Sequence, residues 1–128
     1  MVAFNSSKFV LADTSVWVDH FRRGNPALAK ALAAQRIGTH DFVIGELTLG
    51  SLPQPVPDVG DLRLLPLMPI VETDVCIAFV REHRLIGKGL GWMDAHLLAS
   101  ASLAKVGLWT LDRSLRQAAE RLELFEVP

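Results

Sequence analysis

The sequence has 128 residues, a length that fits one folded domain. Half of its residues are hydrophobic and its mean hydropathy is +0.29, which excludes a disordered tail or linker and provides enough apolar side chain for a packed core. The formal net charge of −1 excludes a strong overall attraction for nucleic acid or an anionic membrane, so binding of a polyanion requires a local group of basic residues.

The single cysteine, Cys76, lies in the apolar stretch VCIAFV and excludes an intramolecular disulfide. We expect it to be a buried, inert thiol rather than a nucleophile. The first fifteen residues lack the basic segment and apolar core of a signal peptide. Because charges or prolines interrupt every apolar run before the ~20 residues of a membrane helix, we expect a cytoplasmic protein.

The first part of the chain alternates short apolar runs with helical patterns. Asn25 and Pro26 have the character of a helix cap and a first helical residue. The elements predicted, in chain order, are a strand over about 8–12, a helix over 14–23, a helix from 26 through the segment ALAKALAAQ, an extended piece over 36–40 and a helix over about 41–50.

Five prolines interrupt residues 51–69, where the only regular element predicted is a short helix over 58–65. Gly87, Gly89 and Gly91 separate two later helices. The remaining elements predicted are a possible strand at 70–71, a helix from 73 or 74 to about 85, a helix over about 92–105, a strand over 108–111, a helix over about 113–122 and a possible edge strand in the terminal segment LFEV.

Short apolar strands that alternate with longer helices predict the α/β class, with a parallel sheet covered by helices on both faces. Right-handed crossovers place the carboxyl ends of the strands at one edge, where open α/β sheets bind ligands. Asp13 and Asp112 each follow a predicted strand and precede a helix, so both are predicted to lie at this edge. The alternative is that both are helix N-caps, a role that Asp fills well.

Two further acids lie in helices that are apolar on almost all sides. Glu46 is in FVIGELTLG, and Asp94 is in the first turn of GWMDAHLLASASLA. A buried carboxylate is costly unless its charge is compensated. A thin solvent-facing stripe is the alternative explanation for Glu46, and interaction with the helix macrodipole is the alternative for Asp94.

If the four acids converge, their mutual repulsion raises their pKa values unless a cation lies among them. All four donors are oxygens, and the sequence has no Cys/His ligand spacing, which favours Mg²⁺ or Mn²⁺ over zinc. Such an ion polarises a phosphoryl oxygen, lowers the pKa of an attacking water and stabilises the leaving oxygen. The pattern therefore predicts phosphodiester hydrolysis, the chemistry of a nuclease.

At these residues the sequence resembles the PIN-domain family, specifically the VapC-type toxins. The motifs that carry the resemblance span nearly the whole chain; they are DTS at 13–15, VIGEL around Glu46, DAHLLASA at 94–101 and TLD at 110–112. The resemblance implies that residues 1–128 form a single PIN-like domain. The implied fold is a three-layer α/β/α arrangement with a central, mostly parallel sheet of four to five short strands.

The resemblance also implies a Mg²⁺- or Mn²⁺-dependent endoribonuclease, the toxin of a toxin–antitoxin pair. It implies that Asp13 and Asp94 are the principal metal ligands and that Glu46 and Asp112 complete the acidic cluster. The implied partners are an RNA substrate, a second copy of the chain in a homodimer, and a cognate antitoxin that covers the site.

Two residues depart from the family pattern. Leu115 stands where the family often has an aromatic residue, which is a change of packing only. His96 follows Asp94 by two, at a position that is commonly small or apolar. Because two residues turn a helix by about 200°, we expect His96 to point away from Asp94 as a core or interface residue rather than to act as a general base.

Thr14, Ser15 and Thr110 flank the strand-end acids, and their hydroxyls are candidates to orient a carboxylate or a metal-bound water. Helix capping explains Thr14 and Ser15 equally well. Of the three tryptophans, Trp17 and Trp109 are expected in the core, whereas Trp92 is expected to border the site.

Four arginines are near the predicted edge, where a few phosphate contacts suffice to position RNA, but ordinary solvation is the default for each. They are Arg22, Arg23, Arg113 and Arg116.

Other α/β phosphotransfer classes fit less well. A haloacid-dehalogenase-like hydrolase requires a second Asp where Ser15 stands, and a two-component receiver requires Lys where Asp112 stands. The alternative left open is a non-catalytic PIN scaffold that binds RNA or an antitoxin. The four intact acids argue against it, since a binding module has no need of so much buried negative charge.

Overall fold

The computed structural model describes residues 9–50, 52 and 58–128, and its elements are named in chain order. They are β1 (Val10–Ala12), α1 (Thr14–Arg23), α2 (Pro26–Ala33), β2 (Ile37–Gly38), α3 (Asp41–Leu49), the 3₁₀ helix η2 (Val59–Leu64), α4 (Thr73–Glu82), α5 (Trp92–Ala104), β3 (Gly107–Trp109) and α6 (Arg113–Arg121). Within this part of the chain, no helix is long and apolar enough to cross a membrane.

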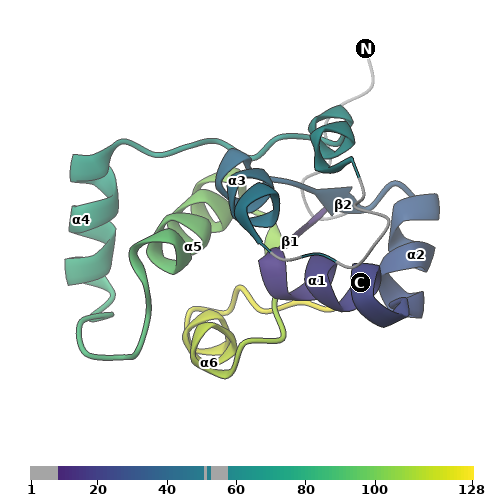
Figure 1. Cartoon of the computed structure of the whole chain (residues 1–128). Helices are drawn as coiled ribbons and strands as arrows, with labels where there is room; N and C mark the ends of the chain where they lie inside the picture. Colours follow the sequence, from purple (N-terminus) through teal and green to yellow (C-terminus); the bar gives the residue numbers. More distant parts are fainter. Residues whose placement is uncertain (1–8, 51, 53–57) are drawn as a thin grey trace, which may run out of the picture.

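The three strands form a parallel sheet in the order β2-β1-β3. Val10 in the central strand pairs with Ile37 on one side and with Gly107 on the other. All three residues of β1 are fully buried, as expected for a parallel strand covered on both faces. Figure 1 shows the strands in the middle of the molecule, with α5 on one side and α2 on the other. The predicted α/β class and three-layer arrangement are confirmed.

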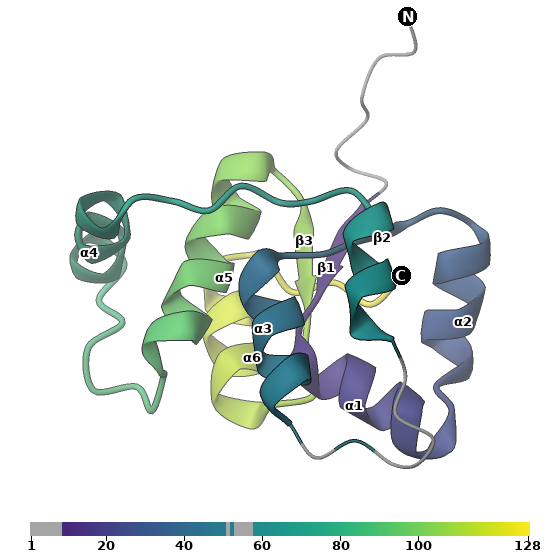
Figure 2. The same cartoon turned by 45° about the horizontal axis from the view of Figure 1, so that its top comes forward.

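The helix predictions are confirmed to within a few residues, and Cys76 on α4 is fully buried. Figures 1 and 2 show α4 outside α5, which it contacts, at a distance from the sheet. Burial raises the pKa of the Cys76 thiol above its ordinary value, which is consistent with the inert thiol that we expected. Two predictions lie partly outside the described residues. They are the proline-rich segment over 51–69, at residues 51 and 53–57, and the first strand over 8–12, at residue 8.

The strand predicted at 70–71 is wrong, because those residues lie in an irregular segment. The chain meets the sheet earlier, where Leu67 forms a parallel bridge with Thr39. Pro66 and Pro69 have no N–H to donate to a ladder, so contact with Thr39 is limited to a bond from its N–H to the Pro66 carbonyl (2.8 Å) and one from the Met68 N–H to its carbonyl (2.7 Å).

The edge strand predicted in LFEV is reduced in the same way to one bridge between Phe125 and Leu108. The described sheet therefore has three strands with a single bridge outside each edge, where four to five strands were predicted. The strand predicted over 108–111 is Gly107–Trp109. It ends there because Thr110 turns toward β1, where its hydroxyl bonds to Asp13.

His40, at the carboxyl end of β2, links the sheet to α5. It is fully buried; its Nδ1 accepts a hydrogen bond from the Phe42 N–H (3.0 Å), and its Nε2 lies 3.0 Å from the Ser100 hydroxyl. The Ser100 hydroxyl donates to the Pro69 carbonyl (2.6 Å), so the imidazole is the donor in the His40–Ser100 bond. Burial lowers the pKa of His40, which favours this neutral form. The chain of bonds fixes α5, and with it the acid at its first turn, against the end of β2.

Candidate active site

Asp13 is at the carboxyl end of the central strand and is only 5% exposed. Its N–H donates to the Trp109 carbonyl (3.0 Å), so the ends of β1 and β3 meet at this residue. Its Oδ1 accepts from the N–H (2.7 Å) and the hydroxyl (2.5 Å) of Ser15, and its Oδ2 accepts from the Thr110 hydroxyl (2.6 Å). Burial raises the pKa of Asp13, and these hydrogen bonds oppose that rise.

The two hydroxyls that face Asp13 are themselves oriented by the backbone. Ser15 Oγ accepts from the Leu111 N–H (2.9 Å), and Thr110 Oγ1 accepts from the Asp112 N–H (3.0 Å). Each hydroxyl therefore has its proton available for the Asp13 carboxylate. The network joins the start of α1 to the turn between β3 and α6. Thr14 takes no part in it, since no side-chain hydrogen bond of Thr14 is found in the described residues.

Asp94 and Asp112 lie on two different helices but act on each other electrostatically. Asp94 is half-buried in the first turn of α5, and its Oδ2 accepts from the Gly91 N–H (2.9 Å). Burial is the main cause that raises the pKa of Asp94, and the charge of Asp112 adds to the rise. Asp112 is exposed and caps α6, because its Oδ2 accepts from the Leu115 N–H (2.9 Å). Capping is thus a real role of Asp112, as it is of Asp13.

Glu46 is half-buried on α3, a helix that packs against α1. Its side chain forms no hydrogen bond or ion pair within the described part of the chain. Nor do any three His, Cys, Asp or Glu residues among the described ones form a group arranged to hold a metal ion. Thr110 connects the Asp13 carboxylate to the Asp112 N–H, and the charge of Asp112 acts on Asp94, but among the described residues neither these three acids nor Glu46 with two of them form such a group.

The donor set at this edge suits a hard cation. Asp94 and Asp112 repel each other, and Asp13 is buried at a cost to its charged form. A cation relieves both costs. Mg²⁺ retains several waters and is commonly held by only one or two carboxylates together with a substrate phosphate. A Mg²⁺ site of this kind does not require a group of three acids. The carboxylates of Asp13, Asp94 and Asp112 are therefore of a chemical type that fits Mg²⁺.

His96 is 3% exposed, in agreement with the predicted core position. Its ring meets those of Phe42 and Trp92 edge-on, with centroid distances of 5.0 and 4.7 Å. Trp92 is 47% exposed at the first position of α5, two residues before Asp94, whereas Trp17 and Trp109 are buried in the core. Trp17 and Trp109 lie in the core as predicted, and His96 packs Trp92 and Phe42 against α5.

A model of the PIN domain matches residues 10–121. The chain therefore belongs to the PIN-domain family. Among characterised proteins, it is similar to Ribonuclease VapC32 from two strains of Mycobacterium tuberculosis, with 40% identity over 110 residues that cover 85% of this chain and 89% of the relative.

Solved structures share the fold at low sequence identity. FitAcB from Neisseria gonorrhoeae has a TM-score of 0.59 at 20% identity, covering 88% of this chain and 94% of that one. FitAB bound to an IR36 DNA fragment has a TM-score of 0.64 at 16% identity, covering 88% and 91%. PAE2754 from Pyrobaculum aerophilum has a TM-score of 0.56 at 17% identity, covering 93% and 90%. These similarities confirm the architecture.

Proposed function

We propose that this chain is a metal-dependent endoribonuclease that hydrolyses RNA phosphodiester bonds and acts as the toxin of a toxin–antitoxin pair. The observation that carries the proposal is the buried carboxylate of Asp13 at the carboxyl edge of the sheet, together with the charge interaction between Asp94 and Asp112. A buried Asp13 is held by two oriented hydroxyls, and Asp94 lies within the field of Asp112. The 40% identity to a ribonuclease over most of both chains supports RNA as the substrate.

The ion in this proposal is Mg²⁺ or Mn²⁺, with Asp13 and Asp94 as its principal ligands and Glu46 and Asp112 completing the acidic surroundings. When bound, such an ion activates water and stabilises developing charge on phosphate oxygens. The other groups of the chain prepare the site: Ser15 and Thr110 hold Asp13 in one orientation and favour its ionised form despite burial. The acids also repel an RNA backbone, so basic residues outside them must hold the substrate.

The proposal includes a single PIN domain in the cytoplasm, a homodimer and a cognate antitoxin that covers the site. Exposed apolar side chains support a protein partner. Leu49 on α3 and Leu64 on the neighbouring η2 are 91% and 86% exposed. Covering them removes apolar surface from water, which favours association.

The experiment that tests the function is cleavage of labelled RNA by the purified chain. We expect cleavage with Mg²⁺ or Mn²⁺, loss of cleavage with excess chelator and recovery when the ion is restored. Cleavage undiminished by chelator contradicts the metal mechanism. Binding of RNA without cleavage under any of these conditions favours the non-catalytic scaffold instead.

The substitution Asp112→Asn separates the two roles of Asp112. Asn caps a helix as well as Asp does, so α6 and the thermal stability are expected to be preserved. The charge that raises the pKa of Asp94 is lost, and NMR titration of the Asp94 carboxyl should show a lower pKa. If the charge serves the reaction, kcat/KM falls by about tenfold or more, the size of effect found when groups around a metal are changed. Unchanged cleavage by the variant would show that Asp112 serves only as a helix cap.

A further inference from the structure

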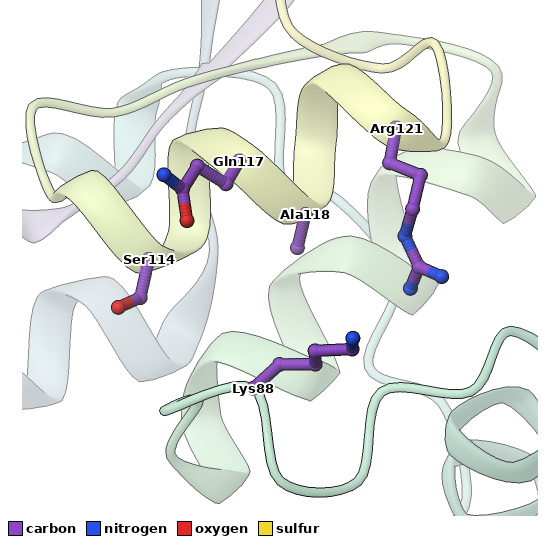
Figure 3. A pocket seen from close by; sticks show the side chains of 5 residues that line it. All are labelled: Lys88, Ser114, Gln117, Ala118 and Arg121. Carbon is purple, nitrogen blue, oxygen red and sulfur yellow. The ribbon is translucent and has the colours of Figure 1, made fainter.

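A pocket of about 180 Å³ lies between α6 and the loop that precedes α5, outside the acids described above. Its lining residues are Lys88, Ser114, Gln117, Ala118 and Arg121. Figure 3 shows Arg121 extending from α6 and Lys88 extending from the facing loop toward the same space. The residues contributed by α6 are spaced i, i+3, i+4 and i+7, so they occupy one face of the helix.

The lining of this pocket suits an anion. It contains two cationic side chains, a hydroxyl and an amide, with the small, buried Ala118 between them, and no carboxylate. Among the residues that the structure describes, neither Lys88 nor Arg121 forms an ion pair with an acid. By contrast, Arg23 pairs with Asp19, and Arg116 pairs with Glu120. Arg23 and Arg116, two of the four arginines that the sequence suggested for RNA, are therefore already paired with acids, whereas, within the described part of the chain, Lys88 and Arg121 are not.

Arg121 is oriented by one hydrogen bond to the backbone. Its Nη2 donates to the His83 carbonyl at 2.7 Å. A guanidinium has five N–H donors in a rigid fork, so most of them are available to a planar or tetrahedral anion. Lys88 is exposed on a flexible stem and adds a point charge. Both side chains line the same pocket.

The two segments that line this pocket, the loop before α5 and the helix α6, are also the segments that lead to Asp94 and Asp112. The loop that carries Lys88 continues through Gly89 and Gly91 to Asp94. At Gly89, where φ is +75°, a Cβ atom would lie 3.2 Å from the Ser114 hydroxyl, so the loop runs close to the first turn of α6. That turn begins directly after Asp112. From Ser114 to Arg121 the helix rises about 10 Å, at 1.5 Å per residue, so the pocket extends away from the acids along α6.

We propose that this pocket binds a backbone phosphate of the RNA, distinct from the phosphate that is cleaved. The proposal rests on the ribonuclease function proposed above. It accounts for how a chain with a net charge of −1 and an acidic site holds a polyanion. Cations beside the site position the backbone without reading its sequence.

The test compares Lys88→Gln with Lys30→Gln, which removes the same charge from exposed α2. Binding of a labelled single-stranded RNA of random sequence is measured by fluorescence anisotropy in chelator, over a series of salt concentrations. For Lys88→Gln we expect about fivefold weaker binding at 0.1 M salt and a slope of log K against log salt that is smaller by about 0.7, as for one lost phosphate contact. Lys30→Gln should match the wild type, and equal melting temperatures confirm that both variants are folded.

Cleavage kinetics separate this proposal from the function itself. With Mg²⁺ or Mn²⁺ we expect Lys88→Gln to raise KM and leave kcat nearly unchanged, because the lost contact does not involve the reacting atoms. If the wild type cleaves RNA but Lys88→Gln equals it in affinity, salt slope and KM, the pocket proposal is overturned and the ribonuclease function stands. If Lys88→Gln weakens binding of an acidic protein partner and not of RNA, the pocket belongs to that partner and the proposal is again overturned. If the wild type does not cleave RNA, the function fails, and the anisotropy comparison still decides the pocket.

Discussion

The Asp13→Asn variant is expected to lose RNA cleavage by about 100-fold or more and to be more stable than the wild type. The loss follows from the proposed role of Asp13 as a metal ligand. A metal ion contributes several kcal/mol to stabilisation of the transition state, and each 1.36 kcal/mol corresponds to a factor of ten in rate. The gain in stability follows from burial, since Asp13 is only 5% exposed.

The sign of the stability effect follows from the raised pKa of Asp13. Burial raises it above 3.8 in the folded protein, so the folded state binds this proton more tightly than the unfolded state does. Between the pKa of Asp13 in the unfolded state and its higher pKa in the folded state, the stability of the protein increases as the pH falls. At neutral pH the ionised Asp13 therefore lowers the free energy of unfolding. Asn carries no charge and caps α1 equally well. A gain of about 1 kcal/mol is in the range of other such stability–activity trade-offs.

Thermal unfolding at pH 7 and pH 4, together with RNA cleavage at pH 7, checks this prediction. At pH 4 the difference in stability between variant and wild type should narrow. The control is Asp58→Asn, because Asp58 is also a helix cap, bonded to the Gly60 N–H at 3.0 Å, but is exposed. It should change neither activity nor stability. An Asp13→Asn protein that cleaves RNA normally, or that is clearly less stable, would falsify the role assigned to this residue.

The sequence predicted the position of Asp13 from simple topology, because a parallel strand must deliver the residue after it to the carboxyl edge. The sequence did not show whether Asp13 only caps a helix or also contacts residues that are distant along the chain. The hydroxyl of Thr110 reaches Asp13 across 97 positions of the chain, and no local pattern carries that information. In the structure Asp13 does both, since it caps α1 and accepts a hydrogen bond from the Thr110 hydroxyl.

Elements of one or two residues were predicted less well. An apolar pair such as Ile70–Val71 looks the same whether it lies in a strand or in an irregular segment, and flanking prolines shift the contact to Leu67. His40 was missed altogether, because one histidine before a helix gives no signal of its own. Its role becomes visible only with its partners Ser100 and Pro69 in place. Lys88 and Arg121 were missed for the same reason, since they come together only when α6 packs beside the loop.

The Asp94→Asn variant is expected to lose both cleavage and the response to the metal ion. Asn keeps an oxygen that can accept from the Gly91 N–H, so the start of α5 should be preserved. The negative charge that a cation requires at this position is removed. An ion that binds only the folded state stabilises it by about 2.7 kcal/mol at 100 times its Kd, so Mg²⁺ or Mn²⁺ should raise the melting temperature of the wild type.

For Asp94→Asn we expect most of that metal-dependent rise to disappear and cleavage to fall by about 100-fold or more. The matched control is Asp74→Asn, since Asp74 lies in the first turn of α4 as Asp94 lies in the first turn of α5, but Asp74 is exposed and Asp94 is half-buried. Its melting temperature should respond to the ion as the wild type does. A full metal-dependent rise in Asp94→Asn would place the ion elsewhere. If both variants lose the metal-dependent rise in melting temperature, the rise comes from general screening of acidic residues rather than from a site at Asp94.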